Sequence, residues 1–218
     1  MSEFYGKQHR ALQQEFDTEK MANRVSEMIV LPEIPDEHRA FIERRDFFFL
    51  TTIDHRGYPT CSHKGGDVGC VKIVDNKTLA FASLDGNGMY LSMGNIALNG
   101  KVGMLFIDFE TPHRVRVHGD ARVSRDDPLL REFPGAELIV RVTLAEIFIN
   151  CPRYIHRYQR VATSPYAPKA DCPIRQAQWK RIDAMQDALP ERDKDLATEL
   201  GGIITMEEYG EMVLKGEG

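Results

Sequence analysis

Asp46-Phe-Phe-Phe-Leu-Thr-Thr-Ile53 is an almost continuous apolar run, of a length and composition typical of a buried β-strand. The run ends at His55-Arg56-Gly57, where Gly57 can adopt the positive φ that a tight hairpin needs. The chain resumes as Tyr58-Pro-Thr-Cys-Ser-His-Lys64 and stops again at Gly65-Gly66-Asp67. Strands joined by so short a turn run antiparallel, so this stretch decides the class of the fold.

Further strand-like runs follow on the C-terminal side of this hairpin. They cover residues 70–74, 78–83, 101–109, 114–124 and 136–150, with one helix expected at 89–98. The turns between them are too short for the helical crossovers of a parallel sheet. We therefore expect a mainly β fold with flanking helices, in the form of a six-stranded antiparallel split β-barrel.

Composition narrows the class of protein. The 218 residues carry a formal net charge of −5, which disfavours a general nucleic-acid binder. No apolar stretch approaches the length of a membrane span, and the N-terminus lacks the order of a signal peptide, so we expect a cytoplasmic protein without a membrane partner. The four cysteines form no CxxC pair, and neither they nor the histidines show a metal-binding spacing.

The pattern suggests three segments along the chain. Residues 1–45 read as N-terminal helices, with an interruption of the helical pattern at Pro32 and Pro35. We expect these helices to pack on the barrel. Residues 46–155 hold the strands. Residues 156–218 read as a loop followed by C-terminal helices.

Ser62 and Lys64 form the first candidate site. In a strand they share one face, and a hydroxyl beside an ammonium group suits a phosphate. Gly65 and Gly66 would let a ligand approach the backbone closely. The alternative is an exposed edge strand with a solvated lysine and a loose turn, which these residues alone leave open.

Two further groups could contribute to an anion site. Asn87 precedes the expected helix, where it could cap the first turn, contact a ligand, or do both. Arg114 lies on the polar face of its strand, where it could reach a phosphate, be solvated, or make a dimer contact. No nucleophile elbow and no convincing Ser/His/Asp set is present.

In their order and spacing, these segments resemble the pyridoxamine 5′-phosphate oxidase-like family of FMN-binding proteins. The matching residues are 47–52, 57–67, 78–83, Gly86-Asn87 with the helix after them, 102–107 and 114–119. The resemblance implies a split-barrel homodimer with two FMN sites at the subunit interface. It also implies contacts to FMN from Ser62, His63, Lys64, Gly65, Gly66, Asp67, Ala82, Ser83 and Asn87, and from Arg114 across the interface.

One departure from the family pattern bears on function. The oxidase has an Arg and a Lys that flank an apolar strand at the phosphate site, whereas the Arg position here is Ser62. The oxidase's C-terminal motif with Trp and Arg is also missing, since Trp179 has different neighbours. The resemblance thus supports FMN binding better than vitamin B6 oxidation.

The expected function is that of an FMN-dependent oxidoreductase acting on a small-molecule substrate or a nicotinamide donor. One alternative keeps the barrel but replaces FMN with the deazaflavin F420 or with haem. Another is a non-catalytic flavin-binding protein, because no substrate motif is recognisable.

Overall fold

The computed structural model describes residues 4–169 and 172–218. The chain divides into two compact units, residues 1–163 with 167–171 and residues 164–166 with 172–218. The first unit contains the seven described strands and both pockets discussed below. The boundaries that the sequence suggests, after residues 45 and 155, stay predictions.

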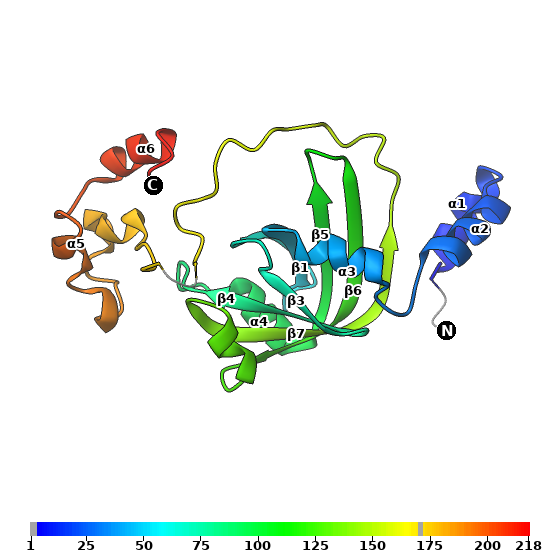
Figure 1. The fold of residues 1–218 in the computed structure, drawn as a ribbon, viewed down its shortest axis with the longest axis horizontal. Coiled ribbons are helices and arrows are strands. Elements are labelled where there is room, and N and C mark those ends of the chain that lie inside the picture. The colour runs from blue at the N-terminus through cyan, green and yellow to red at the C-terminus, as the bar shows by residue number, and fades with distance from the viewer. Residues whose placement is uncertain (1–3, 170–171) are drawn as a thin grey trace. The chain divides into compact units, whose positions relative to one another are not determined.

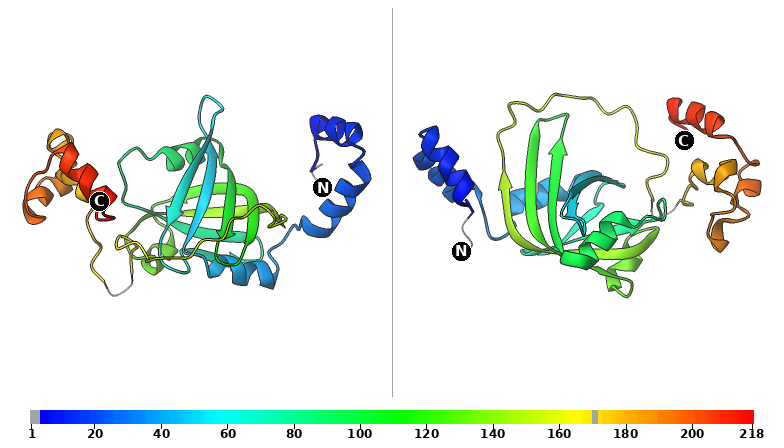
Figure 2. Two further views of the ribbon diagram at one scale, coloured as in Figure 1. Left: turned by 90° about the horizontal axis from the view of Figure 1, so that it is seen from above. Right: turned by 180° about the vertical axis from the view of Figure 1, so that it is seen from behind.

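Seven antiparallel strands form one sheet in the order β2-β1-β5-β6-β7-β4-β3 (Figure 1). Their bounds are β1 Phe47–Ile53, β2 Pro59–Gly65, β3 Val71–Asp75, β4 Thr78–Leu84, β5 Lys101–Asp108, β6 His113–Ser124 and β7 Ala136–Ile149. The predicted fold class is confirmed, but the predicted number of six strands is wrong. β1 and β2 pair along their whole length, so each arm of the hairpin around Gly57 is a strand of its own. Among the described strands β2 and β3 lie at opposite ends of the order, so the sheet curls without closing (Figure 2).

The core lies against one face of this curled sheet. In β6, Val115 and Val117 are fully buried while Arg116 is exposed, as a period of two predicts. Phe48 and Phe81 are almost completely buried, with ring centroids 5.0 Å apart. Burial of each such ring stabilises the fold by about 1.5–3 kcal/mol.

The described residues also form six α-helices. They are α1 Lys7–Glu15, α2 Glu19–Ile29, α3 Asp36–Glu43, α4 Leu91–Asn99, α5 Leu196–Glu199 and α6 Met206–Leu214. α3 packs on β3 and buries His38, Phe41 and Ile42, whereas α1 and α2 have no buried residue. None of the helices in the described residues is both long and apolar enough to cross a membrane.

The second unit contains a buried ion pair and a capped helix. Lys180 Nζ lies 2.9 Å from Asp193 Oδ2, and both side chains are almost completely buried. α6 begins with a capping box, in which Thr205 Oγ1 accepts from the N–H of Glu208 and the Glu208 carboxylate accepts from the N–H of Thr205.

Candidate functional site

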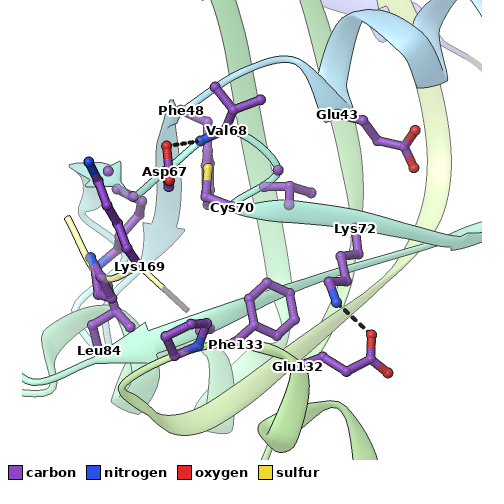
Figure 3. A pocket seen from close by; sticks show the side chains of 18 residues that line it. Glu43, Phe48, Asp67, Val68, Cys70, Lys72, Leu84, Glu132, Phe133 and Lys169 are labelled. Atoms are coloured by element: carbon purple, nitrogen blue, oxygen red, sulfur yellow. Dashed lines mark hydrogen bonds and ion pairs between the residues drawn. The ribbon is translucent and has the colours of Figure 1, made fainter. Parts of the chain in front are cut away.

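Two adjoining pockets lie beside β2. The larger, about 450 Å³, is bounded by the β2–β3 loop, β4 and the residues that follow the 3₁₀ helix Pro128–Glu132 (Figure 3). The smaller, about 320 Å³, is bounded by β2, the end of β4 and the loop that leads into α4. Lys64 and Leu84 line both, so the two pockets share a wall.

The register of β2 decides which of its side chains face the pockets. Ser62 pairs with Leu50 and Lys64 pairs with Phe48, both of which are buried in β1. Ser62 and Lys64 therefore share one face, as predicted, and both are half-buried. His63 is exposed and packs on aromatic rings of β1, yet it also lines the smaller pocket.

Lys64 is a half-buried ammonium group without a counter-ion. Neither an ion pair nor a hydrogen bond joins its side chain to another described residue. Burial removes part of its hydration and lowers the pKa of Lys64 below the usual value of a lysine. Lys72 of the larger pocket differs, because its Nζ lies 2.5 Å from Glu132 Oε2 (Figure 3). An anionic ligand would supply the counter-charge that Lys64 lacks.

The loop before α4 turns through two residues of left-handed conformation. Gly88 has a φ of 75°, and Tyr90 has a φ of 47°, which costs a non-glycine residue about 1–2 kcal/mol. α4 then begins at Leu91, and no side chain caps its N-terminus. Uncapped N–H groups at the positive end of a helix dipole suit an anion such as phosphate.

Asn87 lines the smaller pocket but does not cap α4. Its Oδ1 accepts a hydrogen bond of 3.1 Å from the N–H of Met89, which stabilises the turn ahead of the helix. The capping role considered for Asn87 is therefore wrong, while contact with a ligand stays a prediction. Ser83, at the end of β4, lines the same pocket.

Four other predicted residues, Gly65, Gly66, Asp67 and Ala82, line the larger pocket. A Cβ on Gly66 would lie 2.9 Å from Cys70 Cβ, so packing alone already favours glycine there. Burial raises the pKa of the Cys70 thiol to about 12. This thiol is protonated at neutral pH and is a poor nucleophile.

Arg114 lies apart from both pockets. Its Nη2 donates a 2.9 Å hydrogen bond to the carbonyl of Cys151, and its Nε is buried without a partner among the described residues. The structure thus gathers the predicted residues of β2, β4 and the loop before α4 and leaves Arg114 outside. Contact between Arg114 and a cofactor across a subunit interface stays a prediction.

Sequence patterns missed two kinds of pocket residue. Tyr90 and Ser92 line the smaller pocket, and Ser92 Oγ lies 3.2 Å from Ser62 Oγ. The sequence predicts a helix that starts at residue 89, whereas α4 starts at Leu91. Tyr90 and Ser92 therefore lie at the first turn of the helix, which the prediction missed. Phe133 of the larger pocket follows a 3₁₀ helix, and no local pattern connects it with β2.

Among the described residues, the smaller pocket offers hydrogen-bond donors and one lysine without an ion pair, rather than metal ligands. Within residues 4–169 and 172–218, no group of three His, Cys, Asp or Glu side chains could hold a metal ion. Hydroxyl groups of Ser62, Ser83 and Ser92 surround the smaller pocket together with Lys64. This donor set is suited to a phosphate group.

Comparison with solved structures finds several weak likenesses. HupZ of Group A Streptococcus is 19% identical, with 53% of this chain and 93% of HupZ covered and a TM-score of 0.45. An FMN-binding protein from Syntrophomonas wolfei is 13% identical, with 64% and 97% covered and a TM-score of 0.41. An F420 reductase is 20% identical, with 52% and 98% covered and the same TM-score.

Sequence comparison gives a clearer assignment. The curated proteins provide no match for the chain. The family model described as pyridoxamine 5′-phosphate oxidase matches residues 34–159, which is more than half of the chain and includes the whole sheet. The chain therefore belongs to the pyridoxamine 5′-phosphate oxidase family.

Proposed function

We propose that the chain binds FMN, with the phosphate in the smaller pocket beside Lys64. The observation that carries this proposal is the half-buried ammonium group of Lys64, which has no counter-ion among the described residues. A phosphate would restore the charge balance and form charge-assisted hydrogen bonds. Family membership adds independent support for a cofactor in this barrel.

The other residues around the pockets fit the same ligand. Ser83 and one member of the hydrogen-bonded pair Ser62 and Ser92 offer hydroxyl donors, and the first turn of α4 offers backbone N–H groups. The larger pocket has apolar walls such as Phe48 and Phe133, which suit the ring system of a flavin or a substrate beside it.

We further propose that the protein is an FMN-dependent oxidoreductase acting on a small-molecule substrate or a nicotinamide donor. Bound FMN would supply the hydride and electron chemistry, while the chain binds and orients it and limits the access of water. No protein nucleophile is needed, so a protonated Cys70 is consistent with this function.

The proposal includes a homodimer in which each site is completed by a second copy of the chain. Arg114 is the residue expected to act across that interface. The support for this role is membership of the family, since Arg114 lines neither pocket of its own chain.

Equilibrium titration with FMN, F420 and haem tests the choice of cofactor. We expect FMN to bind most tightly. Tighter binding of F420 or haem would show that this other cofactor, and not FMN, is the ligand.

Anaerobic mixing of the FMN-loaded protein with NADH or NADPH tests the activity. Rapid loss of the oxidised flavin spectrum supports an oxidoreductase with a nicotinamide donor. If neither nicotinamide nor a panel of other reductants and oxidisable small molecules reduces the flavin, a non-catalytic flavin-binding protein is the better account.

A further inference from the structure

Asn95, in the middle of α4, makes a buried polar contact with the β1–β2 hairpin. Its Nδ2 donates to Thr52 Oγ1 at 3.0 Å and to Thr60 Oγ1 at 3.2 Å. The two hydroxyl oxygens lie 2.8 Å apart, and Asn95 is only 7% exposed. One amide thus joins the helix to both strands of the hairpin.

A second polar contact lies one turn closer to the helix N-terminus. Ser92 is three residues before Asn95 and so faces the same side of α4. Its Oγ lies 3.2 Å from Ser62 Oγ of β2. Thr60 and Ser62 share a face of β2, so the two contacts follow each other along the strand toward Lys64.

Apolar packing alone would not determine the position of α4 along β2. Met93 and Ile96 bury their side chains in the core, but burial of apolar surface is non-directional. Hydrogen bonds require defined distances and angles, so the contacts of Ser92 and Asn95 restrict the rotation and axial position of the N-terminal half of the helix. They thereby fix where the first turn of α4 lies relative to Lys64.

We propose that Asn95 is a positioning residue for the cofactor phosphate, acting through the first turn of α4. Asn95 lines neither pocket, so it would not touch the ligand. It would hold the N–H groups at Leu91 and Ser92 in place at the smaller pocket, which Lys64 also lines. This inference rests on the proposed binding of FMN.

Comparison of FMN with riboflavin tests the inference, because riboflavin has the same ring system without the phosphate. In the Asn95→Ala variant we expect the affinity for FMN to fall roughly tenfold and that for riboflavin by less than about twofold. If Asn95 had only a structural role, its replacement would lower the affinities for FMN and for riboflavin by the same factor. An unchanged ratio of the two affinities in a folded Asn95→Ala protein would overturn the inference.

Asn99→Ala is the matched control. Asn99 lies at the other end of α4, is exposed, and donates to the carbonyl of Ile53 at 3.1 Å. We expect this variant to keep the wild-type ratio of FMN to riboflavin affinity, and an equal fall in both variants would contradict a specific role of Asn95.

Two further measurements keep the outcomes distinct. If Asn95→Ala does not fold, Thr60→Val removes one acceptor of the same amide from the strand side, and we expect a fall of the ratio in the same direction. An unchanged ratio there would also overturn the inference. If the wild-type protein does not bind FMN at all, the proposed function itself fails, and the positioning role fails with it.

Discussion

At the residue scale, Lys64 is the side chain on which the proposed binding of FMN depends most. Replacement by alanine removes the only cation that lines the smaller pocket among the described residues. We expect FMN binding to weaken by roughly 1.5–3 kcal/mol, the range for a hydrogen bond to a charged group. Fluorescence titration measures this change. Lys101→Ala is the control, because Lys101 is an exposed strand residue paired with Asp120. Equal affinities in wild type and Lys64→Ala would show that Lys64 is only a solvated strand residue.

The cysteines provide a second test at the residue scale. Burial raises the pKa of the Cys70 thiol to about 12, whereas a hydrogen bond from the backbone N–H of Arg153 lowers the pKa of the exposed Cys151. Because the thiolate is the reacting form, iodoacetamide should label Cys151 first and Cys70 last at pH 8. Mass spectrometry of the labelled native protein measures the order. Labelling of Cys70 at the rate of Cys151 would contradict the described environment.

Alternation along β2 was sufficient to predict that Ser62 and Lys64 share a face, because the period of a strand is fixed by its backbone. The missing counter-ion of Lys64 could not be predicted in the same way. It depends on which carboxylates the β2–β3 loop and α3 bring near, and those distances arise from tertiary packing. The raised pKa of Cys70 could not be predicted from the sequence either, because it results from burial of the thiol in the folded protein.

At the scale of elements, the irregular pairing of β6 with β7 gives a sharp prediction. The register shifts between His118 and Gly119, and a Cβ on Gly119 would lie 2.5 Å from the carbonyl oxygen of Thr143. Backbone cannot easily move away, so Gly119→Ala should lower the free energy of unfolding by about 1–3 kcal/mol. Chemical denaturation measures the loss.

Gly103→Ala is the matched control for that variant. Gly103 lies in β5, opposite His118, and an added Cβ would meet its nearest neighbours at an ordinary 3.8 Å. We expect a clearly smaller effect on stability. Equal losses in the two variants would contradict the close contact described at Gly119.

The strands and the inserted helix could be predicted because runs of Phe, Val and Ile between turn residues carry a strong local signal. The start of α4 could not, since Tyr90 adopts a left-handed conformation that propensities do not favour for tyrosine. The start was expected at residue 89 because Asn87 is a common capping residue. The expected number of six strands was wrong for a simpler reason: it took the two arms of the first hairpin as one strand, although the sequence marks both arms.

At the scale of the whole molecule, we propose that a second copy of the chain completes the site. We expect sedimentation velocity to show a dimer of the FMN-loaded protein. Arg114→Ala should weaken FMN binding without unfolding the barrel, because Arg114 is not part of the core. A monomeric FMN-loaded wild-type protein, or an Arg114→Ala variant that binds FMN with wild-type affinity, would contradict the interface role of Arg114.

The absorption spectrum of the protein as purified is the simplest test of FMN binding. We predict a yellow protein with the bands of an oxidised flavin, and release of FMN rather than FAD or riboflavin on denaturation. A colourless protein that also fails to bind added FMN would contradict it.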